Sequence, residues 1–256
     1  MDPDPLQSFR LDGRVAIVTG ASSGLGDRFA RVLAAAGARV VVAARRADRL
    51  ASLVADLPDA WAVACDLTEA GAPANLVAAT LEHYGRVDVL VNNAGSSDPT
   101  PALDETTDHF RATVELNLVA PFELAREAAQ AMVARGGGSI VNVASIWALV
   151  GVGQIPEAGY AASKGGIVSL TRELAAQWAR RGVRVNALAP GWFHTEMTDG
   201  VMFGDERAER WLSSRTPMGR GGAPHELDGA LLFLAGDASS FVTGTVLSVD
   251  GGWTAI

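Results

Sequence analysis

Hydrophobic residues along the chain follow two alternating patterns, short continuous apolar runs and longer amphipathic segments. The short runs are rich in valine, isoleucine and alanine, which is typical of strands covered on both faces. They predict strands at 14–19, 39–44, 61–64, 87–92, 139–144, 184–189 and 245–249. The longer segments predict helices, among them 24–36, which stops at Gly37, a continuous helix over 104–135, and 159–181, which stops at Gly182.

This alternation of strands and helices predicts an α/β fold. Each strand–helix–strand unit requires a right-handed crossover between parallel strands, so we expect a doubly wound parallel sheet of the Rossmann type with about seven strands. Ligands of such sheets bind outside the carboxyl ends of the strands. No linker, low-complexity tract or internal repeat interrupts residues 1–256, and this length suits one domain.

The composition excludes several functional classes. Hydrophobic residues make up 48% and charged residues 20%, and the net charge of −8 disfavours binding to nucleic acid or to an anionic membrane. No apolar run has the length of a membrane-spanning helix, and the acidic, proline-interrupted start does not resemble a secretory signal. The single cysteine, Cys65, has no disulfide partner, so we expect a cytoplasmic protein and assign Cys65 no function.

A glycine-rich turn follows the first predicted strand and opens the first helix. Residues 19–26 have the spacing T-G-x-x-x-G-x-G, in which Gly20 permits a sharp turn, Gly24 a close approach by a pyrophosphate and Gly26 tight helix–strand packing. The helix N-terminus adds free N–H groups for phosphates. A tight turn without a ligand is the alternative interpretation. The cofactor-binding residues expected here are Gly20, Ser22, Ser23, Gly24, Leu25 and Gly26.

The end of the second predicted strand bears on the choice of dinucleotide. An NAD site usually places an acidic residue there, but this chain has Arg45 and Arg46, with no acid before Asp48. Arginine pairs well with a 2′-phosphate, so NADP(H) is favoured over NAD(H). The alternative is that both arginines are simply solvated.

Two other strand ends carry candidate cofactor residues. Asp66 and Leu67 follow the third strand and are placed to hold the adenine ring. Asn93 and Gly95 follow the fourth, in the sequence NNAG, whose small residues leave room for a ribose. Ordinary turn chemistry is the alternative, because Asp, Asn and Gly all favour turns.

Several motifs in order give the chain a family resemblance. They are TGASSGLG at 19–26, NNAG at 92–95, Asn117 in ELNL, Ser145 after VNVA, YAASK at 160–164, NALAPG at 186–191 and DGGW at 250–253. With these motifs the chain resembles the short-chain dehydrogenase/reductase family over essentially its whole length. The resemblance implies a nicotinamide-dependent oxidoreductase with four catalytic positions, Asn117, Ser145, Tyr160 and Lys164.

The residue chemistry agrees with that implied role for Tyr160 and Lys164. Tyr160 would be the general acid when a ketone is reduced and the general base when an alcohol is oxidised. A free phenol titrates near pH 10, about three units too high for a base at neutral pH. Lys164 is the only lysine of the chain and lies four residues later, on the same helical face, so we expect its ammonium to lower the phenol pKa. A surface lysine is the alternative.

The resemblance also implies roles for residues beyond this pair. Ser145 would hydrogen-bond the substrate carbonyl, Lys164 would bond the nicotinamide ribose, and Asn117 would hold a water that connects Lys164 to solvent. Transfer of the pro-S hydride is implied as well. The segment expected to seat the nicotinamide contributes Pro190, Gly191, Phe193 and Thr195.

The substrate side departs from the family pattern. Ser145 and Tyr160 are 15 positions apart, so the intervening segment 146–159 is about two residues longer than usual. Bulky apolar residues around the expected pocket favour a hydrophobic ketone or secondary alcohol. The alternative is that several of them pack a mobile lid, expected over about 195–218. The residues expected to contact substrate are Ser145, Trp147, Tyr160, Trp192, Met197, Met202, Phe203 and Trp211.

Other functions remain open alternatives. A 3-oxoacyl thioester on an acidic carrier would prefer a basic mouth, but acidic and basic residues are interleaved over 205–215. A non-catalytic dinucleotide-sensing regulator would need the glycine turn but not the serine, tyrosine and lysine together. The four histidines are scattered, so no metal site is expected. The resemblance implies a homo-oligomer, a tetramer or dimer, packed through helices 104–135 and 159–181.

Overall fold

The computed structural model describes residues 4–196, 198–199 and 202–256. Across these residues, seven parallel strands form one sheet in the order β3-β2-β1-β4-β5-β6-β7. Each predicted strand is confirmed, with ends that differ by up to two residues. The strands are β1 Val15–Thr19, β2 Arg39–Ala44, β3 Ala60–Ala64, β4 Val89–Asn92, β5 Gly138–Val143, β6 Val183–Pro190 and β7 Val246–Val249.

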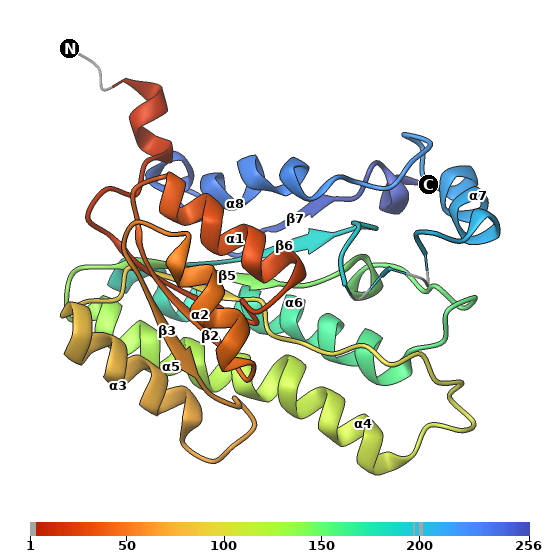
Figure 1. Cartoon of the computed structure of the whole chain (residues 1–256), viewed down its shortest axis with the longest axis horizontal. Helices are drawn as coiled ribbons and strands as arrows, with labels where there is room; N and C mark the ends of the chain where they lie inside the picture. The colour runs from red at the N-terminus through yellow and green to blue at the C-terminus, as the bar shows by residue number, and fades with distance from the viewer. Residues whose placement is uncertain (1–3, 197, 200–201) are drawn as a thin grey trace.

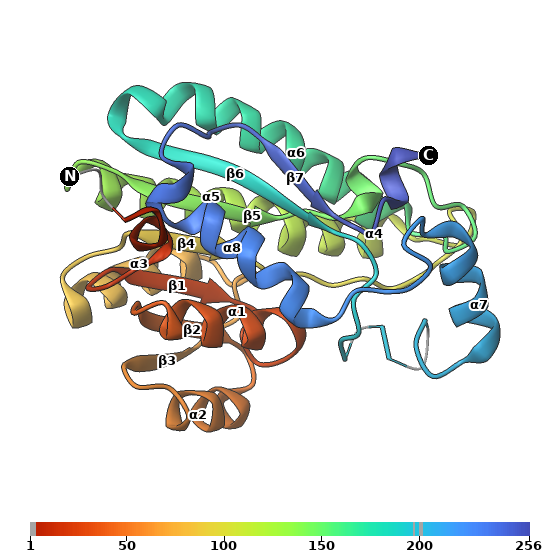
Figure 2. The same cartoon turned by 90° about the horizontal axis from the view of Figure 1, so that it is seen from above.

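The helices other than α7 lie in two layers, one on each face of the sheet (Figures 1 and 2). Short 3₁₀ turns connect several of these elements. The α-helices of the described residues are α1 Gly24–Ala35, α2 Ala47–Ala55, α3 Ala72–Tyr84, α4 Thr107–Val114, α5 Ala120–Val133, α6 Ala158–Trp178, α7 Glu206–Arg215 and α8 Asp228–Ala235.

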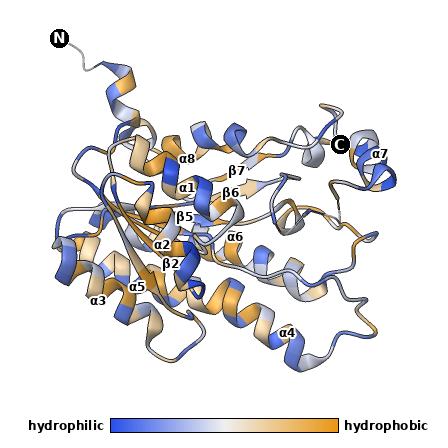
Figure 3. Ribbon diagram, viewed as in Figure 1, coloured by the Kyte–Doolittle hydropathy of each residue, from blue (hydrophilic) through white to orange (hydrophobic). Residues whose placement is uncertain are grey.

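Alternation along the strands builds the two halves of the core. In β1, Ala16 and Val18 pack in a cluster with residues of α1, α2 and α8. Val15 and Ile17 point the other way and pack with residues of α3, α5 and α6. All four side chains are fully buried, and this burial on both faces explains why the strand sequences are continuous runs of apolar residues. Figure 3 shows this apolar interior between helices whose outer faces are polar.

The helix predicted over 104–135 differs from the structure at its start and in its middle. Helix α4 starts at Thr107, because the Thr106 side chain accepts a hydrogen bond from His109 N and caps the helix there. A π-helical turn, Glu115–Val119, then lies between α4 and α5. Such turns insert an extra residue into a helix and occur often at functional sites.

The helix predicted over 159–181 is confirmed as α6, continued by a 3₁₀ turn over Ala179–Arg181. Gly182 ends it with a φ of 80°, a left-handed conformation that suits glycine. The chain therefore forms the single Rossmann-type domain that the sequence predicts. All seven strands are parallel, so their carboxyl ends lie at the same end of the sheet, and α7 lies beyond that end (Figure 1).

Candidate active site

A cavity of about 260 Å³ lies at the carboxyl ends of β1, β4, β5 and β6. Its walls come from loops after these strands and from the first turns of α1 and α6. Most of the predicted cofactor and catalytic residues meet here. The predicted site residues that line it are Gly20, Ser23, Gly24, Leu25, Gly26, Asn93, Gly95, Ser145, Trp147, Tyr160, Lys164, Pro190, Gly191, Trp192, Phe193, Thr195 and Met202.

The glycine turn has the backbone geometry that close approach by a phosphate requires. Gly20 and Gly24 have φ values of 65° and 55°, which side chains other than glycine rarely adopt. A Cβ atom on Gly26 would lie 2.2 Å from Gly20 O, so only glycine fits between α1 and the turn. Ser23 occupies the N-cap position of α1, but its side chain makes no cap hydrogen bond. The first N–H groups of α1 are therefore suited to bind an anion.

Hydrogen bonds from Asn93 hold the ends of β1 and β4 together. Its side-chain amide donates to Thr19 O at 2.8 Å. The backbone N–H groups of Asn93 and Ala94 both donate to Thr19 Oγ1 at 3.0 Å. Thr19 was not among the predicted site residues, although it begins the glycine motif. The Thr19 side chain therefore holds the end of β4 next to the start of the glycine turn.

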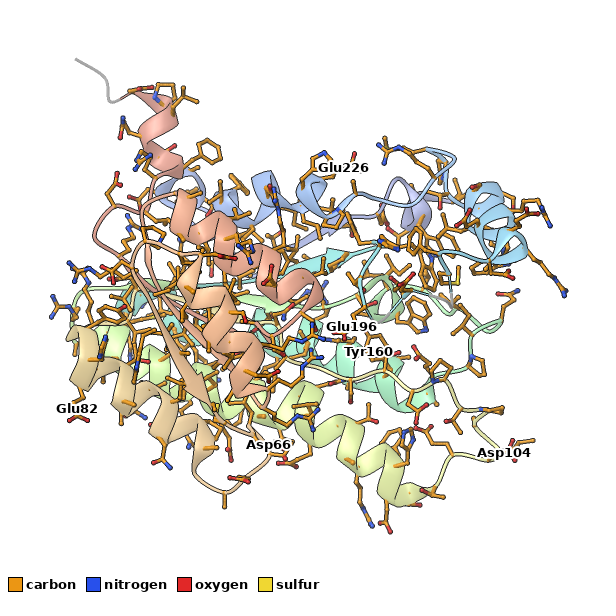
Figure 4. All side chains as sticks on the ribbon, in the orientation of Figure 1. Asp66, Glu82, Asp104, Tyr160, Glu196 and Glu226 are labelled. Carbon is orange, nitrogen blue, oxygen red and sulfur yellow. The ribbon has the colours of Figure 1, made fainter. Side chains whose placement is uncertain are left out.

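Arg46 lies beside the glycine turn. Its guanidinium donates to the hydroxyls of Ser22 and Ser23 and to the carboxylate of Glu196, at 3.1–3.2 Å for the carboxylate. Glu196 comes from the loop after β6 and also lines the cavity, and Figure 4 shows it with Tyr160 in the same region. Its pKa is lowered, mainly by the hydrogen bond from Arg46. The guanidinium is thus held between the glycine turn and the loop after β6.

The remaining predicted adenosine residues lie outside the main cavity. Arg45 is largely exposed and comes within 3.9 Å of Asp66. Asp66 accepts two hydrogen bonds from Thr68, from its N–H and its hydroxyl, which lower the Asp66 pKa. Leu67 is buried and packs in the core. The Asp66 carboxylate therefore stabilises the local turn through its hydrogen bonds from Thr68.

Tyr160 and Lys164 lie one turn apart on α6, and both side chains reach the cavity. Lys164 is buried, with 4% of its surface exposed, and its ammonium donates to Val143 O at 2.7 Å. Lys164 Nζ lies 5.6 Å from the centre of the Tyr160 ring. Ser145 follows β5, is also buried, and its hydroxyl accepts from Trp147 N at 3.3 Å. The surface-lysine alternative is therefore wrong.

The expected lowering of the Tyr160 pKa is wrong for the cofactor-free protein. The pKa of Tyr160 is raised to about 12, because burial penalises the phenolate. Hydrogen bonding with Ser145 opposes this shift, and the Glu157 carboxylate adds to it. Burial also lowers the pKa of Lys164 to about 8. The lysine charge is directed at the Val143 carbonyl, so Tyr160 is a protonated donor here.

Asn117 lies in the π-helical turn, 1% exposed, with its side-chain amide bonded to the loop after β4. Its oxygen accepts from Ser96 N at 2.9 Å, and its nitrogen donates to Ser96 O at 2.9 Å and to Ser163 Oγ at 3.2 Å. This clamp brings Gly95 so close that a Cβ there would lie 3.1 Å from Asn117 Oδ1 and 3.6 Å from Lys164 Nζ. Asn117 thereby positions the cavity wall beside the lysine.

The apolar wall contains part of the predicted substrate set. Trp147, Trp192 and Met202 line the cavity, as predicted. Phe203 and Trp211 do not; they pack in the cluster behind that wall. The Trp211 ring lies 6.2 Å from Trp192, and a Cβ on Gly221 would meet the Phe203 ring at 2.7 Å. Met197, also predicted, lies outside the described residues.

Several residues that line the cavity were not predicted from the sequence, and the most informative of them is Glu157. It is 9% exposed, lies three residues before Tyr160, and accepts a hydrogen bond from the Ser97 hydroxyl. Glu157 is the only charged residue in segment 146–159, a signal that sequence inspection could have used. The others in this group are Ala94, Ser97, Pro99, Val143, Ala144, Ile155, Glu196 and Thr198.

Two further searches concern the described residues alone. Within them, no cluster of His, Cys, Asp and Glu side chains could hold a metal ion. No helix there combines the length and apolar character needed to span a membrane.

Comparisons with known proteins agree with this geometry. A family model described as enoyl-(acyl carrier protein) reductase matches residues 20–254. The chain is 45% identical to galactitol 2-dehydrogenase (L-tagatose-forming) of Cereibacter sphaeroides, over 96% of this chain and 97% of that protein. It is 42% identical to cis-4-hydroxycyclohexanecarboxylate dehydrogenase of Sinomonas cyclohexanicum, over 95% of this chain and 97% of that protein.

A solved structure extends the agreement to three dimensions. Gluconate 5-dehydrogenase from Burkholderia cenocepacia, in complex with NADP and tartrate, has a TM-score of 0.93 to this chain and 38% sequence identity. The match covers 99% of this chain and 100% of that one. These relatives are named as dehydrogenases, so an enzyme is supported rather than a non-catalytic regulator. The chain belongs to the short-chain dehydrogenase/reductase family and is an NAD(P)-dependent oxidoreductase.

Proposed function

We propose that this enzyme transfers a hydride between NADP(H) and a hydrophobic ketone or secondary alcohol, with Tyr160 as the proton-transferring residue. The observation that supports this most is a single cavity lined by both the glycine turn and the Ser145, Tyr160 and Lys164 side chains. A dinucleotide bound at the turn would thus extend toward the phenol. When bound, the nicotinamide supplies or accepts the hydride.

The chain's own residues supply the proton and the polar contacts. With a pKa of about 12, Tyr160 holds its proton at neutral pH and can donate it to the oxygen of a ketone. Ser145 is the residue proposed to hydrogen-bond the same oxygen as negative charge develops on it. Lys164 is the residue proposed to bond the nicotinamide ribose, and Asn117 holds the adjoining wall in place.

Preference for NADP(H) is proposed from the charge around the adenosine end. Arg46 is held next to the glycine turn by Ser22 and Ser23, and Arg45 is exposed beside it. A 2′-phosphate would replace the Glu196 carboxylate as a partner of Arg46. Solved relatives with bound NADP support this choice.

A largely apolar substrate is proposed from the opposite wall of the cavity. Trp147, Ile155, Trp192 and Met202 form a surface on which a hydrocarbon skeleton can pack. The name of one relative, cis-4-hydroxycyclohexanecarboxylate dehydrogenase, indicates a ring alcohol as its substrate, which suits such a wall. We propose residues 195–218 as the lid over this part of the site.

Assembly into a tetramer or dimer is also proposed. Phe110 on α4 and Phe122 on α5 are more than one-third exposed, in the region that the family resemblance assigns to packing between subunits. Mass photometry of the purified protein would give the number of subunits. A monomer at micromolar concentration would contradict this proposal.

The function is tested by a panel of ketones and secondary alcohols run with NADPH, NADH, NADP⁺ and NAD⁺. We expect a higher kcat/KM with NADP(H), and turnover of bulky cyclic ketones. Tyr160→Phe should lower kcat by about a thousandfold or more while leaving NADPH binding intact, because the variant lacks the acid. Near-normal turnover by that variant would contradict the assignment of the proton donor.

A further inference from the structure

A buried carboxyl group lies in the substrate part of the cavity, where the proposed hydrophobic substrate gives it no role. Glu157 and Ser97 line the same cavity as Tyr160 and the apolar side chains of Trp147 and Trp192. We propose that Glu157, with Ser97, selects substrates that carry a second, uncharged hydroxyl group and discriminates against substrates that carry a carboxylate. This inference rests on the proposed function and specifies its substrate class.

The backbone around Glu157 fixes the carboxyl relative to the catalytic tyrosine. Thr100 pairs with Glu157 in an isolated parallel bridge, and Thr100 N donates to Pro156 O at 2.8 Å. Glu157 O accepts from Ala161 N at 2.9 Å in the first turn of α6. Because Tyr160 lies on that same turn, the carboxyl and the phenol are held by one rigid element. A substrate bound to the phenol would therefore meet the carboxyl at a constant offset.

The Glu157 side chain does not serve the helix that it precedes. It occupies the N-cap position of α6, yet it makes no side-chain cap hydrogen bond. Its carboxylate accepts instead from Ser97 Oγ, on the loop after β4, and both residues line the cavity. The side chain is therefore not used to cap α6, and its remaining acceptor capacity is available to a group bound in the cavity.

The charge around Glu157 determines which substrates are favoured and which are disfavoured. Within the described residues Glu157 makes no ion pair; burial raises its pKa, the hydrogen bond from Ser97 opposes this shift, and the nearby Asp98 carboxylate adds to it. A carboxylate can accept several hydrogen bonds, so the one from Ser97 leaves capacity for a substrate hydroxyl. A hydrogen bond to a charged acceptor is worth about 1.5–3 kcal/mol. A substrate carboxylate would instead place a second negative charge in a site of low dielectric constant.

Three matched ring alcohols test this selectivity with NADP⁺ as the cofactor. They are cyclohexanol, trans-1,4-cyclohexanediol and cis-4-hydroxycyclohexanecarboxylate, and the variants are Glu157→Gln and Glu157→Leu. We expect the wild-type enzyme to favour the diol over cyclohexanol, and Glu157→Leu to lower that preference about tenfold or more. Glu157→Gln should raise kcat/KM for the carboxylated alcohol by about tenfold, because the amide carries no charge. Cyclohexanol is the reference in every comparison, because its turnover reports any effect that the lost Glu157 charge has on the Tyr160 pKa.

The control is Glu105→Gln, which removes a carboxylate that lies nearby, pairs with His109 and does not line the cavity. It should leave the kcat/KM values of the three alcohols unchanged relative to one another. If Glu157→Leu kept the wild-type diol preference, or if Glu157→Gln left the carboxylated alcohol as poor a substrate as before, the proposal would be overturned. Should Glu157→Leu fail to fold, Ser97→Ala takes its place, with a smaller loss of diol preference expected.

Binding measurements separate this inference from the proposed function. Trp147 and Trp192 line the cavity, so the change in tryptophan emission when an alcohol displaces water from it reports the affinity of each alcohol for the NADP⁺ complex. If no compound were turned over, the proposed function would fail. The order of affinities and its response to Glu157→Leu and Glu157→Gln would still support or contradict the role of Glu157.

Discussion

Lys164 illustrates at the scale of one residue how a group proposed for catalysis opposes folding. Its ammonium is buried, and the pKa falls from 10.5 to about 8, so the folded state disfavours the charged form. Below pH 8 both the folded and the unfolded chain bind the proton, and the full cost is present. Between about pH 8 and 10.5 the unfolded state binds more protons, so this cost shrinks and stability rises with pH.

Replacing this lysine by an apolar side chain should therefore stabilise the cofactor-free protein. We expect Lys164→Met to abolish turnover yet raise the free energy of unfolding at pH 7 by on the order of 2 kcal/mol. Urea unfolding at pH 7 and at pH 9.5 would show the gap to wild type narrowing at the higher pH. Tyr160→Phe is the control, because a phenol with a pKa near 12 is neutral in the folded state at both values. A gap that widened with pH would contradict this account.

The behaviour of Tyr160 could not have been predicted from the sequence. The i, i+4 spacing correctly indicated that Tyr160 and Lys164 share a helical face. It could not show that the ammonium donates to Val143 O, on a strand far away in the chain, or that burial outweighs its influence on the phenol. Hydrogen-bond partners of this kind depend on tertiary contacts, which local spacing does not encode.

At the scale of elements, the turn after β1 depends on the contact between Gly26 and Gly20. A Cβ on Gly26 would press on the Gly20 backbone, which has no flexible end to move aside. We expect Gly26→Ala to weaken NADPH binding by about tenfold or more and to lower stability by on the order of 2 kcal/mol. Isothermal titration calorimetry and thermal unfolding measure these effects.

The matched control is Gly229→Ala, in the exposed part of α8, where an added Cβ would meet nothing within 4 Å. It should leave NADPH affinity unchanged and raise stability by about 0.5–1 kcal/mol, because alanine favours the helix. Equal effects of the two substitutions would show that close packing at the turn is not what glycine provides.

The π-helical turn between α4 and α5 carries a second prediction at this scale. Asn117→Ala would leave the N–H and the carbonyl of Ser96 without their partner. We expect a loss of about 2–3 kcal/mol in the free energy of unfolding and a lower kcat, because Ser96 holds Gly95 beside Lys164. Asn117→Asp keeps the bond from Ser96 N but sets an acceptor oxygen against the Ser96 carbonyl, so it should lower stability as well. Unaltered kcat in Asn117→Ala would contradict the positioning role.

Periodicity predicted the strands and helices well, but not this turn. A single extra residue shifts the apolar stripe too little to be recognised in one sequence, and asparagine is merely a mediocre helix former. Phe203 and Trp211 were assigned to the pocket for a related reason. Their hydrophobicity shows that they are covered, whereas the partners that cover them, such as Trp192 and Trp253, come from distant segments.

At the scale of the whole molecule, a group of stabilising hydrogen bonds lies at the end of the sheet opposite the cavity. Arg184 lies near the start of β6, and Pro190, at its carboxyl end, lines the cavity about 20 Å away. The Arg184 guanidinium joins the sheet to the segment around α8, donating to Leu234 O and Gly236 O at 3.0 Å and to Ser239 Oγ at 2.7 Å. The same side chain also donates to Val242 O.

Arg184→Met should therefore destabilise the fold without altering the chemistry. We expect the free energy of unfolding to fall by about 3 kcal/mol, because several carbonyl groups lose a charged donor and the apolar stem is retained. Below the unfolding transition, kcat should stay within twofold of wild type, about 0.4 kcal/mol. Arg111→Met removes an exposed guanidinium whose one ion pair among residues 4–196, 198–199 and 202–256 is with Asp108 on its own helix, and should cost less than about 0.5 kcal/mol. A large fall in kcat for Arg184→Met at 20 °C would mean that the two ends of β6 are coupled.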